Sequence, residues 1–300
     1  DAVKFQTHIF DAESLPYAPA PKYFTAESRK SFFERTSFTQ SHWQDLKSHV
    51  ESKGITFISS PFSIEAIELL ERITVQMYKV PSGEVTNLPY LQVMARTGKP
   101  ILLSTGMSSF QEIDRAVETI TKYNNNLSLL QCTSSYPCDY KEVGLNLIGE
   151  MKERYGLPVG LSDHTLTIFA SLAAVTLGAE IIERHFTLSR KLYGPDAQFS
   201  LEPDSMKALA EGIRAVDVMK NSAVDKNNIS RFADMKKIFE KSIVTKVFIP
   251  KGTLVTEQML AFKKPGDGIR ADKIHEVVGK VVMSDIPKNT KIRKEFLSER

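Results

Sequence analysis

The sequence predicts a parallel α/β barrel followed by a small β-rich domain. Seven short apolar runs show no polar alternation, which is typical of parallel strands covered by helices on both faces. Segments with apolar residues three and four positions apart lie between these runs and indicate helices. Every run also ends in a cluster of polar residues, where barrels place their chemistry. Seven such units within residues 1–220 favour a barrel, with an open doubly wound sheet as the alternative.

Strands and helices are expected to alternate along this region. The predicted strands are Ala2–Phe5, Ile55–Ile58, Met77–Val80, Ile101–Leu103, Leu127–Leu130, Val159–Leu161 and Ile181–Ile182. The predicted helices are Ile64–Glu71, Leu88–Thr97, Gln111–Lys122, Leu145–Tyr155, Ile168–Leu177 and Asp204–Met219. The usual barrel has eight strands, and the sequence opens directly on the first apolar run, with no earlier element to pair beside it. We therefore expect an upstream segment to supply the eighth strand.

The pattern changes after Lys220. Residues 221–241 begin as a polar stretch, continue into a predicted short basic helix (Ile229–Lys241), and are interpreted as a linker. From Ser242 onward, short β runs are broken by turns that contain proline and glycine. This pattern predicts a small β-rich domain over residues 242–300. Its predicted strands are Val244–Ile249, Val277–Met283 and Lys291–Arg293.

Composition argues against several classes of protein. The formal net charge is +3 and no long basic run occurs, which disfavours nucleic acid as a partner. No apolar stretch approaches the roughly 20 residues that a membrane helix needs, which disfavours a membrane protein. The two cysteines, Cys132 and Cys138, show neither metal-type spacing nor a disulfide framework. These features favour a reducing, cytoplasmic setting.

Two histidines are the sharpest candidates for chemistry. His164 and His185 each follow a buried strand, and the strands are consecutive, so we expect the side chains to meet above the barrel rim. Neutral imidazole is the commonest transition-metal ligand, and two such groups with open positions suit a catalytic divalent ion. A hydrogen-bonded structural role is the alternative for each. The neighbouring Asp163 and Glu183 either orient the rings or point into the helix layer.

Two lysines lie at or near strand ends. Lysine is rarely buried without a partner, so Lys4 and Lys79 each need an anion, either a protein carboxylate or a phosphate or carboxylate of a ligand. Hydroxyl groups that follow the other strands converge on the same predicted pocket: Ser60, Ser82, Ser104, Ser134 and Ser162. The combination favours a phosphorylated substrate. Structural salt bridges and a Schiff-base lysine are the alternatives.

Four further polar residues complete the predicted rim. Glu84 follows a Ser-Gly turn and is a candidate general base or ligand for sugar hydroxyls, with capping of the next helix as the alternative. Asp196 lies in a Tyr-Gly-Pro-Asp loop and is interpreted as a substrate-facing carboxylate or a turn former. Gln6 and Tyr136 add hydrogen-bonding capacity. A polar substrate is therefore expected beside the phosphate.

Several motifs, in this order, together resemble the sialic acid synthase family. They are Val3–Thr7 (VKFQT), Ser60–Ser63 (SPFS), Lys79–Glu84 (KVPSGE), Ser104–Met107 (STGM), Gly160–Thr165 (GLSDHT), Glu183–Thr187 (ERHFT) and Gly194–Asp196 (GPD). Near the C-terminus, Ile249–Gly252 (IPKG) and Lys264–Gly268 (KPGDG) resemble the family's antifreeze-protein-like (SAF) domain. The segment Thr7–Phe38 is more similar to bacterial legionaminic acid synthases than to enzymes that make neuraminic acid.

The resemblance implies a fold, a partner and a cofactor. The fold would be a (β/α)8 TIM barrel joined by a linker to the SAF domain, in a homodimer whose SAF domains cap the partner's active site. His164 and His185 would bind a divalent ion, manganese foremost, with magnesium or cobalt as alternatives. Together with Glu84 they would form the catalytic set.

The resemblance also implies substrates. Phosphoenolpyruvate would condense with an acylated amino-hexose, 2,4-diacetamido-2,4,6-trideoxymannose or N-acetylmannosamine, to give a nine-carbon α-keto sugar acid and phosphate. Lys4 and Ser60 would hold the carboxylate of phosphoenolpyruvate. Its phosphate would contact Lys79, Ser82, Ser104, Ser134 and Ser162. The sugar would contact Gln6, Glu84, Tyr136 and Asp196, together with Lys264, which stands where the family has an arginine. Alternatives are an N-acetylneuraminate or pseudaminate synthase of the same family, a Schiff-base aldolase, and a non-catalytic sugar-binding module.

Overall fold

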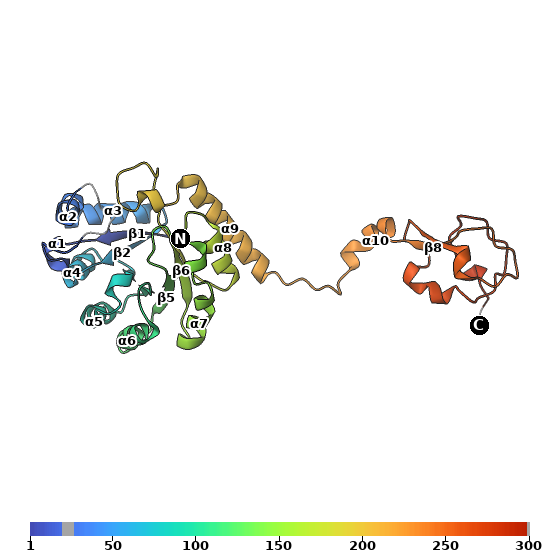
Figure 1. The fold of residues 1–300 in the computed structure, drawn as a ribbon, viewed down its shortest axis with the longest axis horizontal. Coiled ribbons are helices and arrows are strands. Elements are labelled where there is room, and N and C mark those ends of the chain that lie inside the picture. The colour runs from blue at the N-terminus through green and yellow to red at the C-terminus, as the bar shows by residue number, and fades with distance from the viewer. Residues whose placement is uncertain (20–26, 299–300) are drawn as a thin grey trace. The chain divides into compact units, whose positions relative to one another are not determined.

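The chain forms two compact units in the computed structural model, which describes residues 1–19 and 27–298. One unit spans Asp1–Ser222 and the other spans Ala223–Arg300. Along the chain in Figure 1, the first unit runs from blue to yellow-brown and the second from orange to red. Each unit has its own cluster of buried apolar side chains, so each has its own hydrophobic core.

Parallel strands form the sheet of the first unit. They are β1 (Ala2–Thr7), β2 (Thr56–Pro61), β3 (Tyr78–Val80), β4 (Ile101–Ser104), β5 (Leu127–Cys132), β6 (Val159–Asp163) and β7 (Ile182–Arg184). Each strand pairs in parallel with the next strand along the chain, so the spatial order equals the sequence order. A doubly wound sheet reverses its order at a switch point, and this sheet does not. The barrel-like class is confirmed, and the open-sheet alternative is wrong.

The sheet is curled. Lys4 on β1 and Glu183 on β7, the two outer strands of the sheet, form an ion pair of 2.8 Å through their side chains. Opposite edges of a flat sheet of seven strands lie far too far apart for such a contact, because neighbouring strands are spaced about 4.8 Å apart. The inner faces of the strands therefore turn toward one common space, as in a TIM barrel.

Helices surround the strands (Figure 1). They are α1 (Phe10–Glu13), α2 (Arg29–Thr36), α3 (Gln40–Ser52), α4 (Ile64–Arg72), α5 (Leu88–Arg96), α6 (Phe110–Thr121), α7 (Asn146–Tyr155), α8 (Phe169–Thr176) and α9 (Pro203–Asn221). The six helices predicted from periodicity, α4 to α9, lie where expected to within two residues at either end. Within residues 1–19 and 27–298, no helix is long and apolar enough to cross a bilayer.

Local chemistry explains where several helices begin and end. The Ser109 side chain accepts a hydrogen bond from the backbone amide of Glu112, and the Glu112 side chain accepts one from the backbone amide of Ser109. α6 therefore starts with a capping box. Ser63 caps α4 in the same position without the reciprocal partner. α7 ends at Gly156, whose left-handed φ of 62° a glycine adopts without steric cost. The two serines therefore fix where α4 and α6 begin, and Gly156 turns the chain from α7 toward β6.

Helices α1 to α3 were not predicted. α2 buries none of its residues, so it lacks the apolar stripe that reveals a helix in sequence. α3 buries Trp43, Lys47 and Val50, and the lysine within this stripe hides the periodicity. Lys47 is tolerated because its ammonium group pairs with Glu51 at 2.9 Å. Residues 20–26, part of the segment with the legionaminic-type resemblance, lie outside the described residues.

The apolar core of the first unit lies between the sheet and the helices. Strand residues alternate between two faces, and the outward-facing side chains of successive strands are fully buried against the helices. Examples are Phe57, Tyr78, Leu103, Leu129 and Leu161, all at most 1% exposed. The strand residues of the predicted site, among them Ser60 and Lys79, lie on the opposite face of the same strands. Consequently, the outer face stabilises the fold and leaves the inner face free to carry the site.

The second unit is a small β-rich fold with an antiparallel ladder. It contains α10 (Ala233–Phe239), β8 (Ser242–Thr245) and β9 (Leu260–Lys263), and β8 pairs with β9. The prediction of a strand over Val277–Met283 is wrong, because Gly279 adopts a left-handed φ of 80° and the segment makes only isolated bridges. The predicted strand from Val244 ends at Thr245 rather than Ile249, and β9 was missed. Lys291 forms a single bridge to Val244 instead of a strand.

Candidate active site

Strand pairing brings the polar strand ends onto one face. Residues that pair across parallel strands point to the same side of the sheet. Gln6 pairs with Ser60 between β1 and β2, and Cys132 pairs with Ser162 between β5 and β6. Ser162 in turn pairs with Glu183 on β7. Three of the predicted polar residues, Gln6, Ser60 and Ser162, therefore lie on the inner face at the carboxyl ends of the strands.

The two predicted lysines meet at one carboxylate. Lys4 Nζ lies 2.8 Å from Glu183 Oε1, and Lys79 Nζ lies 3.0 Å from Glu183 Oε2. The Lys79 side chain is 5% exposed and that of Glu183 is 15% exposed. The Glu183 carboxylate is thus the anionic partner that Lys4 and Lys79 were each expected to need. Glu183 therefore differs from both expectations for it, because its carboxylate contacts the lysines instead of orienting a histidine or facing the helix layer.

Burial and charge act in opposite directions on these groups. Burial alone would raise the pKa of Glu183, but the two ammonium groups outweigh it and hold that pKa well below its usual range. Burial lowers the pKa of Lys79, and Glu183 opposes this shift. The contact between Lys79 and Oε2 lacks the alignment of a hydrogen bond. The cluster is best described as two ammonium groups held by one ionised carboxylate.

Two hydroxyl groups on the same face have no hydrogen-bond partner among the described residues. They are the Oγ atoms of Ser60 on β2 and Ser104 on β4, both buried. A buried hydroxyl without a partner costs about 1–3 kcal/mol. Such a cost is tolerated where a ligand supplies the missing partner. Both residues belong to the set predicted to hold phosphoenolpyruvate, and that role remains a prediction.

Ser82 and Ser134 converge on the backbone of Gly106. The Ser82 hydroxyl accepts a hydrogen bond of 3.1 Å from the Gly106 amide. A Cβ atom placed on Gly106 would lie 2.4 Å from Ser134 Oγ and 2.7 Å from Ser82 Oγ. Only a glycine fits there with the two hydroxyls in place. The ends of β3, β4 and β5 thus form a small hydroxyl-lined cradle.

The two histidines meet as predicted. The ring centroids of His164 and His185 lie 5.3 Å apart, and Tyr136 packs against both rings at 4.4 and 6.1 Å. His164 Nδ1 lies 3.0 Å from the carbonyl oxygen of Thr133, which can only accept, so Nδ1 carries the proton. In the neutral ring, the other nitrogen, Nε2, therefore presents its lone pair. Burial lowers the pKa of His164, but Cys132 and the Thr133 carbonyl outweigh burial, so that pKa is raised. Burial lowers the pKa of His185 to about 4, so this imidazole is neutral at pH 7.

These properties fit a divalent metal with open coordination positions. Neutral imidazoles are good ligands, and the Thr133 carbonyl fixes the His164 tautomer as second partners of metal-bound histidines do. Within the described residues, no group of three or more His, Cys, Asp or Glu side chains converges as a metal site. A closed structural site is therefore not built here, whereas two imidazoles leave room for substrate oxygens. Metal binding by His164 and His185 remains a prediction.

The remaining predicted residues of the first unit make different contacts. Asp196 Oδ2 is 3.6 Å from His185 Nδ1, which places the loop after β7 beside the histidines. Glu84 accepts a hydrogen bond of 2.8 Å from the side chain of Asn87, and Asn87 itself caps α5. Gln6 Oε1 lies 3.4 Å from His8 Nε2. Glu84 therefore touches the helix start without capping it.

Lys264 belongs to the second unit, where its ammonium group lies 4.9 Å from the centroid of the Phe239 ring. Its side chain is exposed and precedes a cis peptide bond to Pro265. The contact is a cation–π interaction within that unit. A substrate role for Lys264 remains a prediction.

Three residues beside the predicted set also lie near the site. The sequence left the roles of Asp163 and Glu183 open, and it did not single out Cys132 for this site. Asp163 accepts hydrogen bonds from Ser171 on α8 and from the buried Arg184, so of its two readings the one toward the helix layer is right. Cys132 Sγ lies 4.0 Å from His164 Nδ1 and 3.6 Å from Ser82 Oγ. The alternation of β7 was the available signal, because it places Glu183 on the same face as His185 and Arg184 on the other.

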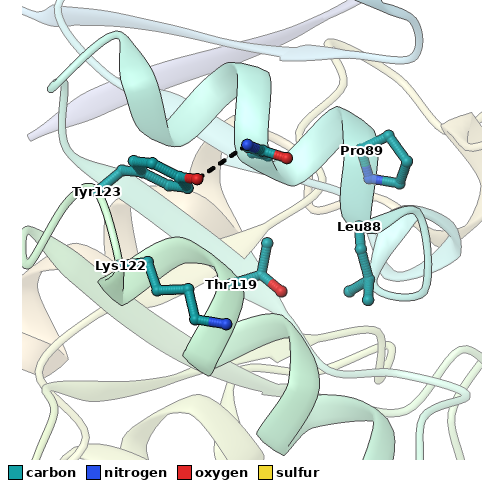
Figure 2. A pocket seen from close by; sticks show the side chains of 6 residues that line it. Leu88, Pro89, Thr119, Lys122 and Tyr123 are labelled. Atoms are coloured by element: carbon teal, nitrogen blue, oxygen red, sulfur yellow. Dashed lines mark hydrogen bonds between the residues drawn. The ribbon is translucent and has the colours of Figure 1, made fainter.

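A separate groove lies in the helical layer. Figure 2 shows Leu88 and Pro89 of α5 facing Thr119 of α6, with Lys122 and Tyr123 just after α6. Its volume is about 250 Å³, and Gln92 donates a hydrogen bond of 2.9 Å to the Tyr123 hydroxyl. None of its lining residues belongs to the strand-end set. The candidate active site is therefore the inner face at the strand ends, not this groove.

Comparison with known proteins agrees with the geometry. The NeuB family matches residues 1–225, and the SAF domain matches residues 240–298. N,N'-diacetyllegionaminic acid synthase of Campylobacter jejuni is 37% identical over 303 residues, covering 98% of this chain and 90% of the relative. Human N-acetylneuraminate-9-phosphate synthase is 32% identical, covering 99% of this chain and 84% of the relative.

A solved structure also matches this chain in fold and sequence. The N-acetylneuraminic acid synthetase of Leptospira borgpetersenii aligns with a TM-score of 0.67 and 30% identity, covering 78% of this chain and 79% of that one. The resemblance predicted from the motifs is thus confirmed. The chain belongs to the NeuB family, the family of the sialic acid synthases, and is a transferase-type synthase with a SAF domain.

Proposed function

We propose that this enzyme condenses phosphoenolpyruvate with an acylated amino-hexose, giving a nine-carbon α-keto sugar acid and phosphate. The observation that carries the proposal is the inner face itself. It combines two ammonium groups, two buried hydroxyls without partners and a pair of neighbouring imidazoles. A substrate with a carboxylate and a phosphate satisfies the first two, and a carbonyl substrate suits the third.

Each part of the site has a proposed role. Lys4 and Ser60 bind the carboxylate of phosphoenolpyruvate. Its phosphate is bound by Lys79, Ser82, Ser104, Ser134 and Ser162. The sugar is bound by Gln6, Glu84, Tyr136 and Asp196, with Lys264 from the SAF domain of a dimeric partner. Holding two substrates face to face supplies a large part of the rate, because the reaction then avoids the entropy of bringing them together.

A divalent ion, manganese foremost, would be held by His164 and His185, and when bound it supplies a Lewis acid for the sugar's aldehyde. The neutral state of His185 and the fixed tautomer of His164 support this assignment. Glu84 is the proposed group for moving a proton during the reaction. Replacing either histidine with alanine is expected to abolish metal binding and turnover together, with the far-UV circular dichroism spectrum unchanged.

The proposed sugar is 2,4-diacetamido-2,4,6-trideoxymannose, which makes the product a legionaminic-type acid. The 37% identity to a diacetyllegionaminic acid synthase supports this choice, and N-acetylmannosamine is the second candidate because of the 32% identical human relative. The test is phosphate release from phosphoenolpyruvate and manganese with a panel of acylated amino-hexoses. Turnover highest with N-acetylmannosamine would overturn the legionaminic assignment, and no phosphate release with any sugar would overturn the synthase proposal.

A Schiff-base aldolase is the second candidate, through Lys79. Such a lysine must be a neutral amine to attack a carbonyl. Burial lowers the pKa of Lys79 and so favours the neutral amine, whereas the ion pair with Glu183 favours the ammonium form and counts against this mechanism. Borohydride added during turnover would trap a covalent adduct only if Lys79 acted as a nucleophile.

The free thiols of Cys132 and Cys138 fit a reducing compartment, and we propose the cytoplasm.

A further inference from the structure

The carboxylate between the two lysines is the feature that neither the predicted site nor the proposed roles use. Glu183 reaches Lys4 on the far edge of the sheet at 2.8 Å and Lys79 on β3 at 3.0 Å. Its two oxygen atoms are divided between the two ammonium groups, one each. Three strands that are not neighbours are therefore joined through this one side chain.

The Glu183 carboxylate offsets the repulsion between the ammonium groups of Lys4 and Lys79. Two ammonium groups facing one space, Lys79 buried and Lys4 partly buried, repel each other, and a buried charge without a partner is costly. One carboxylate between two ammonium groups leaves the cluster with a net charge of +1, so it still attracts an anion. It also holds the two nitrogen atoms on either side of a single planar group. Without the carboxylate, the lysines would separate or lose a proton.

We propose that Glu183 is a positioning residue that fixes the spacing of Lys4 and Lys79 for a substrate with two anionic groups. The inference rests on the proposed function, because phosphoenolpyruvate carries a carboxylate and a phosphate. Each ammonium group then binds one anionic group of the substrate, while the Glu183 carboxylate holds both lysine side chains in place. The role acts on binding of phosphoenolpyruvate and leaves the chemical step to other residues.

Two other roles for Glu183 make different predictions. A general base would affect kcat, since proton transfer occurs only after both substrates are bound. A carboxylate that merely competes with the substrate for the lysines would weaken binding, so its removal would lower KM. A positioning residue, in contrast, raises KM for phosphoenolpyruvate when removed and changes kcat little. The three roles are therefore separable by steady-state kinetics.

The test compares Glu183→Gln and Glu183→Asp with the unaltered protein, at saturating sugar and manganese. Glu183→Gln keeps the size but removes the charge, and is expected to raise KM for phosphoenolpyruvate by about tenfold or more with kcat within about threefold. Glu183→Asp keeps the charge but shortens the reach, and is expected to raise KM several-fold. Glu180→Gln is the matched control, because it removes a carboxylate from an exposed ion pair with Lys152 and should leave KM unchanged.

A second readout separates positioning from simple stabilisation of the fold. Inorganic phosphate should raise the Tm of the unaltered protein, and this increase should shrink by at least half in Glu183→Gln. A purely structural role would lower the Tm of the variant and leave the phosphate-induced increase intact. If Glu183→Gln does not fold, Glu183→Asp decides the question by the same two measurements.

Three results would overturn the inference: an unchanged KM, a lower KM, or a loss confined to kcat. Failure of the proposed function has a different signature. In that case the unaltered protein releases no phosphate from phosphoenolpyruvate with any sugar, and the thermal shift with inorganic phosphate still tests Glu183.

Discussion

Filling the cradle at Gly106 should weaken phosphoenolpyruvate binding more than it destabilises the fold. In Gly106→Ala the new methyl group would lie 2.4 Å from Ser134 Oγ and 2.7 Å from Ser82 Oγ, both far inside van der Waals contact. The backbone of Gly106 does not have the left-handed φ that disfavours alanine. The substitution therefore acts on the hydroxyl groups and not on the backbone.

The size of the effect follows from the hydrogen bonds at stake. A hydrogen bond to a charged group contributes about 1.5–3 kcal/mol, so losing both hydroxyls from a bound phosphate costs about 3–6 kcal/mol. That range corresponds to a factor of roughly 10² to 10⁴ in affinity. Part of the loss is recovered if the serine side chains rotate, so we expect KM for phosphoenolpyruvate to rise at least tenfold. The fold loses the bond from the Gly106 amide to Ser82, worth about 1 kcal/mol.

The assay is phosphate release at varied phosphoenolpyruvate concentration, with thermal unfolding followed by circular dichroism in parallel. Gly83→Ala is the control, because a Cβ atom on Gly83 meets nothing within 4 Å and its φ is not left-handed. The control should leave KM within about twofold, as ordinary surface substitutions do. A Gly106→Ala protein whose KM also stays within twofold would refute the assignment of Ser82 and Ser134 to the phosphate.

Three further substitutions test other parts of the account. Ser104→Ala should raise KM for phosphoenolpyruvate by about tenfold yet leave Tm unchanged or higher, because it removes a buried hydroxyl that lacks a partner; a lower Tm would contradict this. Tyr193→Phe removes the hydroxyl that ties the loop after β7 to Glu27, so KM for the sugar should rise a few-fold while KM for phosphoenolpyruvate stays constant. Equal changes in both would argue against a role for the loop. A hydrogen bond from Arg154 lowers the pKa of Asp114, so its stabilising effect is present above the unfolded pKa of about 3.9 and is lost as pH falls through the folded value. Asp114→Asn should therefore reduce the drop in Tm between pH 5 and pH 3, and an unchanged drop would count against this linkage.

The barrel was predictable because its signals are local. The run Val159–Leu161 is apolar without alternation, and the following helix repeats apolar residues at helical spacing, so strand and helix both followed from a few neighbouring residues. The meeting of His164 and His185 was predictable for the same reason. Both end consecutive strands, and consecutive strands in this class are neighbours.

The contacts that depend on the curl of the sheet were not predictable. Glu183 and Lys4 lie at opposite ends of the strand order, and nothing in the sequence links them until the sheet brings its edges together. α3 was missed because the buried Lys47 interrupts its apolar stripe. In the second unit, the apolar run at Val277 resembles a strand, but Gly279 turns the backbone out of extended geometry. Long-range packing and single backbone angles decided these cases.

The fate of one oxygen atom tests the central claim most directly. Phosphoenolpyruvate labelled with oxygen-18 at the bridging position, between carbon two and phosphorus, should be turned over with manganese and the amino-hexose that gives the highest rate. We propose that carbon three of phosphoenolpyruvate attacks the aldehyde, water adds at carbon two, and phosphate leaves by carbon–oxygen cleavage. The label should then appear in the released phosphate, seen by its mass. Unlabelled phosphate would mean cleavage between phosphorus and oxygen, and would contradict the proposed reaction.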